Sequence, residues 1–201
     1  MDLIFLATLV AFAFWMVKSQ EQRRRIALLG SHLGKYQIEK NMETLTQGYL
    51  RALGEDDAER REQIFNLLRP TEQALGGQFE RFAADFSRVD PADARVSMLP
   101  VYLPFASRLA AATFDMRAAL TIHARGISDA VADGNPALPR DKAFTLSAEL
   151  FLMQHTCHWF CKSRTVASAR MMARHHTAYD KVIASVAPAT RAAYCALVGR
   201  R

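Results

Sequence analysis

An uninterrupted apolar run opens the chain. Leu3 to Val17 carries no charged or strongly polar residue, and Lys18 and then Arg23, Arg24 and Arg25 follow it. The fifteen residues of the run extend about 22 Å as a helix, which is shorter than a hydrocarbon core of about 30 Å. Local bilayer thinning and a snorkelling Lys18 close part of that gap. We therefore expect a membrane anchor in residues 3–17.

Two other interpretations of this run remain open. A cleavable secretory signal has basic residues before its apolar part and a small-residue cleavage site after it, whereas here Asp2 precedes the run and KSQEQRRR follows it. A buried core helix normally keeps one polar face, and this run has none. Because basic residues collect on the cytoplasmic side of a membrane, a retained anchor predicts that the body of the protein lies in the cytoplasm.

Behind the anchor, apolar residues recur at helical spacing. Between residues 35 and 53 they step by three or four, which places them on one helix face: Ile38, Met42, Leu45, Tyr49 and Leu53. Gly54 suits the end of this helix, and the acidic residues 55–57 suit the start of the next. Gly30 and Gly34, just upstream, are expected to form a hinge or to admit another helix at close range.

Two longer apolar stripes follow. The first comprises Ile64, Leu68, Leu75, Phe79, Phe82, Phe86 and Val89, and Pro70 within it predicts a kink or a brief restart. The second comprises Phe105, Leu109, Ala112, Met116, Leu120, His123, Ile127 and Ala130. Between them, residues 90–93 break the pattern, and the proline-containing segment 98–105 is expected to be an extended connector.

The C-terminal third predicts one long helix and one short one. Residues 133–136, together with Pro139, form the strongest turn signal in the chain, and a helix from about Asp141 is expected to continue without a breaker to Val186. Beyond Lys162 this helix is basic all round, which predicts that it projects beyond the core. Pro188 suits the first turn of a final helix that ends at Gly199.

These stripes predict an all-α protein, with an N-terminal single-pass membrane anchor helix followed by an antiparallel bundle of about four helices. No segment shows convincing strand alternation. The 201 residues, half of them apolar, suffice for one domain with its own core. We expect an anchor and basic juxtamembrane segment over residues 1–34 and a cytoplasmic helical bundle over residues 35–201.

Charge and composition indicate the binding partners, the redox compartment and the kind of organism to expect. Of the net charge of +6, residues 1–35 carry +3, residues 36–133 carry −4 and residues 142–201 carry +7. The basic C-terminal block either neutralises the acidic middle of the same fold or meets phosphate in lipid or nucleic acid. Nucleic acid is disfavoured because aromatic stacking platforms are few. Three cysteines suit a reducing compartment, and 20 arginines against 6 lysines, with 33 alanines, favour a GC-rich bacterium.

Candidate ligands for a metal gather between His155 and Cys161. On a helix, Cys157 and Cys161 lie one turn apart and His158 lies three residues before Cys161. Two thiolates and an imidazole suit zinc or copper(I), and His123 is the candidate for a further ligand. The alternative is packing, because Cys157 lies in an apolar stripe, where a free cysteine behaves as a small hydrophobe. His123 is then a hydrogen-bonded core histidine, and we expect this alternative, with no metal and no cofactor.

The remaining polar groups are expected to be structural. His175 and His176 are expected at a solvated helix end, with pH sensing or phosphate binding as the alternative. The acidic residues between Glu55 and Glu59 are expected to stabilise a helix start, and Cys195 is expected to be structural.

Catalytic motifs with a recognised mechanism are absent from the sequence. We therefore expect a membrane-tethered helical interaction or assembly subunit without catalytic activity of its own, in a bacterial inner membrane. Its expected partners are the bilayer through residues 3–17, a protein partner or a second copy, and anionic lipid through Arg23, Arg24 and Arg25. The alternative is a membrane-bound metal- or cofactor-binding protein or enzyme that uses Cys157, His158 and Cys161.

Overall fold

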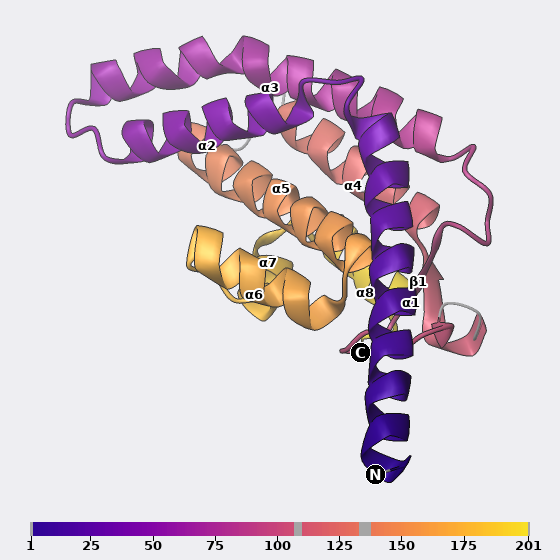
Figure 1. Cartoon of the computed structure of the whole chain (residues 1–201). Coiled ribbons are helices and arrows are strands. Elements are labelled where there is room, and N and C mark those ends of the chain that lie inside the picture. The colour runs from indigo at the N-terminus through magenta and orange to yellow at the C-terminus, as the bar shows by residue number, and fades with distance from the viewer. Residues whose placement is uncertain (1, 107–109, 133–137, 201) are drawn as a thin grey trace.

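The protein is almost entirely helical, so the all-α prediction is confirmed (Figure 1). The computed structural model describes residues 2–106, 110–132 and 138–200. The elements of this part of the chain are α1 (Asp2–Leu33), α2 (Ile38–Leu53), α3 (Ala58–Phe86), β1 (Arg95–Ser97), the short 3₁₀ helix η2 (Ala110–Ala112), β2 (Thr113–Asp115), α4 (Met116–Val131), α5 (Pro139–Cys161), α6 (Arg164–His175), α7 (Tyr179–Ser185) and α8 (Pro188–Leu197).

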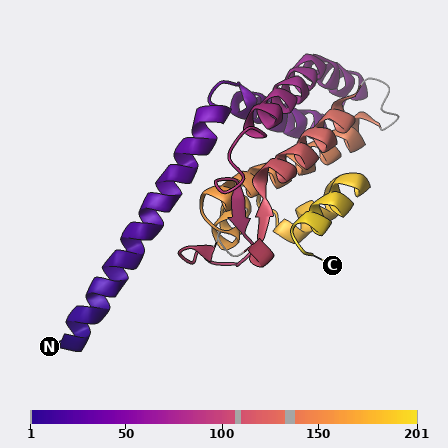
Figure 2. The ribbon, with the colours of Figure 1, turned by 90° about the vertical axis from the view of Figure 1, so that its right-hand side faces the viewer.

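Helix α1 is continuous over 32 residues, and its N-terminal half stands away from the rest of the protein (Figures 1 and 2). The side chains from Leu3 to Met16 are exposed. Among the described residues, α1 is the one helix long and apolar enough to cross a membrane, judged by length and composition. The apolar run and the basic segment behind it therefore form one rod without a break.

Helices α2 to α5 run in alternating directions and enclose the core (Figure 1). The apolar stripes predicted within them point inward, since Leu45, Leu75, Phe82, Leu120 and Leu146 are fully buried. Helices α2 and α3 approach closely, because a Cβ at Gly48 would lie 2.6 Å from a methyl carbon of Leu68. The shorter helices α6, α7 and α8 pack on α4 and α5. The bundle therefore contains more helices than the four that were predicted.

One continuous helix was predicted from Phe105 to Ala130, but among the described residues of this stripe the α-helix begins at Met116, so the earlier start was wrong. Leu109 of the stripe lies outside the described residues. Asp115 caps α4, because its carboxylate accepts a hydrogen bond of 2.8 Å from the backbone N–H of Arg117. Before this cap, β2 pairs with β1 in antiparallel register, with Val96 opposite Phe114. Strands of three residues are too short to produce a recognisable alternation, which is why this ribbon was missed.

The single helix predicted from Asp141 to Val186 is also wrong. Helix α5 ends at Cys161, and Ser163 then caps α6 by accepting a hydrogen bond from the backbone N–H of Val166. Helix α6 lies along α5 (Figure 1) and buries Ala167 and Met171, so the basic segment does not project beyond the core. His176 ends α6 in the left-handed conformation, with φ of 49°, which the sequence did not signal.

Other boundaries agree with the sequence in part. Helix α3 passes through Pro70 without a restart, and Gly30 lies inside α1 with open space around it rather than at a hinge. Pro188 begins α8, which ends two residues before Gly199, whose φ is 67°. The turn predicted at residues 133–136 lies outside the described residues, and Pro139 after it is the first residue of α5.

Candidate functional site

The C-terminal half of α1 is attached along the helical domain. Leu29 is buried, and Leu28 and Leu33 pack against the core. The spacing of four residues between Leu29 and Leu33 places both on one helix face. On the same helix, Gln22 accepts a hydrogen bond of 3.0 Å from Lys162 at the end of α5. The C-terminal half of α1 is therefore packed into the fold rather than joined to it by a flexible linker.

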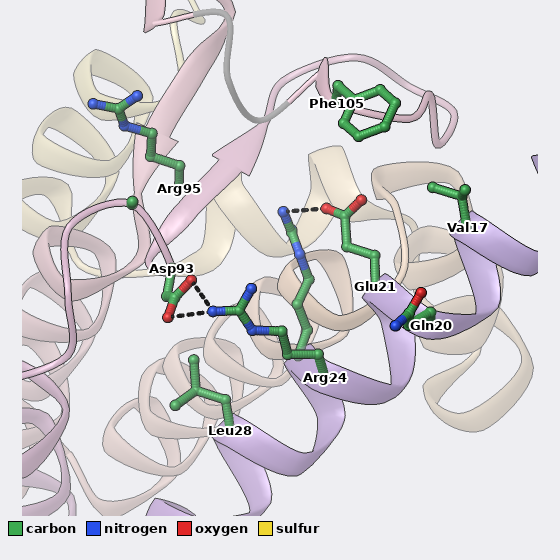
Figure 3. A pocket seen from close by; sticks show the side chains of 10 residues that line it. Val17, Gln20, Glu21, Arg24, Leu28, Asp93, Arg95 and Phe105 are labelled. Carbon is green, nitrogen blue, oxygen red and sulfur yellow. Dashed lines mark hydrogen bonds and ion pairs between the residues drawn. The ribbon is translucent and has the colours of Figure 1, made fainter.

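Two of the three arginines that follow the apolar run, Arg24 and Arg25, bind the helical domain. Nη2 of Arg24 donates to both carboxylate oxygens of Asp93, at 2.7 and 2.8 Å, as Figure 3 shows. Arg25 is partly buried, lies 2.8 Å from Glu21 and donates to the carbonyl oxygen of Phe160 at 3.1 Å. The guanidinium carbon of Arg25 also lies 5.4 Å from the centre of the Phe160 ring, within the range of a cation–π contact.

These contacts border a crevice of about 410 Å³ between α1 and the β1–β2 ribbon (Figure 3). Its walls include Val17, Gln20 and Glu21 from α1 and Arg95 and Phe105 from the ribbon side. The crevice thus lies where the apolar run of α1 gives way to charged residues.

The three candidate metal ligands line one wall of a second crevice, of about 280 Å³, between α1, α2 and α5. Cys157, His158 and Cys161 share it with Met42 and Met153. The Cys157 thiol donates to Met153 Sδ at 3.8 Å. The spacing on α5 therefore does bring the two thiols and the imidazole to one surface, as the sequence predicts.

The protonation of the two thiols opposes metal binding. Burial raises the pKa of Cys161 to about 11 and holds the pKa of Cys157 well above its usual range. Both thiols are then protonated at neutral pH, whereas the thiolate is the ligand form. Burial also lowers the pKa of His158, and its Nδ1, 3.3 Å from the Arg170 guanidinium, accepts a hydrogen bond there.

His123 is not brought into this crevice. It is fully buried on α4, and its Nε2 lies 2.9 Å from Oγ1 of Thr156. Because the Thr156 hydroxyl donates to the carbonyl oxygen of Leu152 at 2.9 Å, the imidazole N–H must donate to Thr156. His123 is therefore the hydrogen-bonded core histidine of the packing interpretation, and burial lowers its pKa to about 3.

A buried polar chain continues from this pair. The Tyr194 hydroxyl lies 3.3 Å from Thr156 Oγ1 and 3.1 Å from the Tyr179 hydroxyl. His155 stacks on Tyr179 at 4.0 Å, with its Nε2 3.0 Å from Ser168 Oγ, and burial lowers its pKa to about 3. This chain ties α4, α5, α7 and α8 together and was not foreseen, because its members lie far apart in the sequence.

Two buried carboxyl groups were also missed. Glu149 is fully buried on α5 and accepts a hydrogen bond of 3.0 Å from the backbone N–H of Ala187, and burial raises its pKa to about 7. Gly126 on α4 makes room for it, because a Cβ there would lie 2.6 Å from Glu149 Oε2. Glu72 accepts from the Tyr49 hydroxyl at 2.5 Å and pairs with Lys142 at 2.5 Å. Glu149 stands between Ala148 and Leu150, and a charged residue between apolar neighbours is a signal that the sequence offered. Glu72 stands between Thr71 and Gln73 and offered no such signal.

The remaining candidates take structural positions. Asp57 caps α3, accepting from the N–H groups of Glu59 and Arg60. His175 stacks on Phe151 at 3.8 Å, with its Nε2 2.7 Å from Gln154 Oε1, and His176 is exposed. Cys195 is a free, partly buried thiol on α8.

The described residues contain no group of three or more His, Cys, Asp or Glu side chains arranged to hold a metal ion. What the arrangement does provide is a rigid junction of ion pairs and apolar contacts between α1 and the helical domain. In comparisons with known protein families, with characterised proteins and with solved structures, nothing matches this chain.

Proposed function

We propose that this chain is a single-pass, membrane-tethered helical subunit that holds an interaction domain at a membrane surface and has no catalytic activity of its own. The observation that carries the proposal is the structure of α1. Its residues from Leu3 to Met16 form an apolar, exposed segment, whereas its second half packs against the domain. An exposed apolar face of this size marks a surface for a membrane or a partner.

The attachment of α1 supports a role in positioning. Arg24 joins α1 to Asp93 in the turn before β1, and Arg25 joins α1 to the carbonyl oxygen of Phe160 on α5. A domain joined through a continuous helix keeps one orientation relative to the bilayer, whereas a flexible linker would let it rotate. A fixed orientation suits the presentation of one face to a protein partner or to a second copy of the chain.

The charge distribution supports the location. Lys18 and Arg23 to Arg25 follow the apolar run directly, which favours a cytoplasmic domain by the positive-inside rule. With the arginine- and alanine-rich composition, we propose the inner membrane of a bacterium. Arg24 and Arg25 bind acidic or carbonyl groups of the domain, so exposed Arg23 is the member of this group best suited to anionic lipid.

Membrane extraction tests the anchor. The full chain is expected to stay in the membrane pellet after alkaline carbonate washing. The double substitution Leu6→Arg with Val10→Arg is expected to release it, because an arginine near the centre of a span costs about 2.5–3.5 kcal/mol on insertion scales. Leu67→Arg is the control, since Leu67 is even more exposed than Leu6 and Val10 but lies on α3. Release of the unmodified chain by carbonate would refute the anchor.

A fusion reporter tests the orientation. A C-terminal reporter that is active only in the periplasm is expected to stay silent, and activity would reverse the topology. Size measurement in lipid nanodiscs then separates the two kinds of partner, because a second copy gives a dimer mass from the purified chain alone.

A second candidate function is metal binding, favoured by the shared crevice of Cys157, His158 and Cys161. Metal analysis of the detergent-purified chain tests it. One equivalent of zinc or copper, lost on Cys161→Ala, would support a metal protein over a purely structural subunit.

A further inference from the structure

We propose that the loop from Pro100 to Phe105 is a second membrane contact, which enters the bilayer interface beside α1. This inference rests on the proposed function, because it takes α1 to be in a membrane. Three apolar side chains of the loop are about half exposed, Val101 at 53%, Leu103 at 48% and Phe105 at 54%. Their alternation with proline and tyrosine concentrates exposed apolar surface within a few residues.

The position of the loop along α1 indicates that its partner is the bilayer interface. The Tyr102 ring lies 6.3 Å from the Phe14 ring, edge to face, and the Tyr102 hydroxyl donates to Glu21 Oε2 at 2.5 Å. One side chain thus joins the apolar run to the first acidic residue behind it. Tyrosines with an apolar body and a polar tip collect at this level of membrane proteins, where hydrocarbon meets water.

The other end of the loop lies at the same level. Phe105 lines the crevice at α1 with Val17 and Gln20 (Figure 3), and Val17 is the last residue of the apolar run. Phe105 adopts φ of 62°, a left-handed backbone conformation that is rare for a bulky residue. In Figure 2 the segment that follows β1, residues 98–106, reaches from the domain toward α1. A bilayer that covers residues 3–17 therefore meets this loop at its surface.

The base of the loop is held by the domain. The carbonyl oxygen of Pro100 accepts from the backbone N–H of Thr165 at 3.1 Å and from its hydroxyl at 2.7 Å. Just before the loop, the Trp159 indole donates to the carbonyl oxygen of Ser97 at 2.9 Å. The apolar side chains are presented on a fixed support, so little conformational entropy is lost when they enter the interface.

The shortness of the apolar run favours contact between the loop and the bilayer. A span shorter than the hydrocarbon core thins the bilayer around it, which brings the lipid surface closer to the domain. Other exposed apolar residues, such as Leu50 on α2 and Leu67 on α3, lie on helices that point away from the exposed half of α1 (Figure 1). Among the described residues, the loop is thus an exposed apolar surface of the domain that lies directly beside the apolar run of α1.

Fluorescence quenching by brominated lipids in vesicles of phosphatidylcholine and phosphatidylglycerol tests the contact. In the full chain with Trp15→Phe, Leu103→Trp adds a reporter to the loop, and Val101→Trp is an independent second reporter. Leu67→Trp in the same background is the control. The buried Trp159 is common to all three. We expect brominated lipid to quench the tryptophans introduced at 101 and 103 and to leave the one introduced at 67 unquenched.

The unmodified chain separates failure of the loop from failure of the anchor. Quenching of Trp15, with no more quenching at 101 and 103 than at 67, would overturn the loop contact and leave the anchor in place. Equal quenching at all three added positions would overturn it as well. A chain that stays in the supernatant with Trp15 unquenched would overturn both the anchor and the loop contact.

Discussion

Arg24 on α1 and Asp93, two residues before β1, are joined by hydrogen bonds of 2.7 and 2.8 Å across 69 positions of sequence. The pair lies where α1 leaves the domain, because one partner belongs to the helix and the other to the turn that leads into the ribbon (Figure 3). One residue further on, Arg25 binds Glu21 and the carbonyl oxygen of Phe160. Neighbouring arginines therefore hold α1 on two sides.

The first prediction concerns how much Arg24 and Arg25 each contribute to the free energy of unfolding. The Arg24 side chain is 70% exposed, so a double-mutant cycle of Arg24→Ala and Asp93→Ala is expected to give a coupling energy of at most about 1 kcal/mol. Arg25→Ala is expected to cost more, about 1–3 kcal/mol, because it leaves partly buried acceptors unpaired. Thermal unfolding of the full chain in mild detergent measures both. A larger cost for Arg24→Ala than for Arg25→Ala would contradict this ranking.

The second prediction concerns the core. Leu120→Asp and Leu150→Asp each place an unpaired charge where the native side chain is fully buried. Each is expected to unfold the domain or to cost several kcal/mol, as a loss of helical dichroism or a large drop in Tm. Leu67→Asp, at an exposed position of α3, is the control and is expected to stay within about 0.5 kcal/mol of the unmodified chain. A silent Leu120→Asp would mean that α4 does not face a core.

Helices that bury one face could be predicted from the sequence, because their buried residues recur at a regular spacing. Leu45, Phe82 and Leu120 recur at helical spacing because one face of each helix is buried. Asp57 was recognisable as a cap because capping depends on neighbouring residues alone. Ser163 has the same chemistry, yet the helical pattern continues on both sides of it, so the corner between α5 and α6 was not evident.

Contacts between distant residues account for what was missed. Thr156 and Tyr194 meet only in the folded chain, and no spacing rule relates positions 38 residues apart. The crevice of Cys157, His158 and Cys161 was predictable because one helix supplies all three. The raised pKa values of its thiols come from burial in the folded chain, which the spacing on α5 does not reveal.

The third prediction concerns the pH dependence of stability. Burial raises the pKa of Glu149 from 4.5 to about 7 in the folded protein. The stability linked to the protonated carboxyl group is therefore fully present below pH 4.5 and is lost as the pH rises through about 7. A shift of this size corresponds to a loss of about 3 kcal/mol.

Glu149→Gln removes that titration and keeps an acceptor for the N–H of Ala187. Its free energy of unfolding, relative to the unmodified chain, is expected to rise by about 3 kcal/mol from acid to mildly alkaline pH. Chemical denaturation at several pH values measures the difference. His123 and His155 titrate in both chains and cancel. A difference that is independent of pH would mean that the carboxyl group ionises at its ordinary pKa.

The fourth prediction concerns Cys157. Its thiol is buried and donates only to Met153 Sδ, a weak acceptor, at 3.8 Å. Cys157→Ser is expected to lower the free energy of unfolding by about 1–3 kcal/mol, because a hydroxyl group at this position is poorly satisfied. Cys157→Ala is expected to be milder, since only a small volume is lost. Cys195→Ser, on the partly exposed thiol of α8, is the control.

A metal ligand at Cys157 would give a different pattern of results. Serine and alanine would then be equally damaging, His158→Ala and Cys161→Ala would reproduce the loss, and a chelator would lower the Tm of the unmodified chain. We expect instead that the purified chain holds less than one equivalent of zinc, copper or iron and that its Tm is unchanged by chelator. Because both thiols are protonated at neutral pH, metal binding would have to release protons. Proton release on titration with zinc, together with a higher Tm, would overturn the packing interpretation in favour of a metal site.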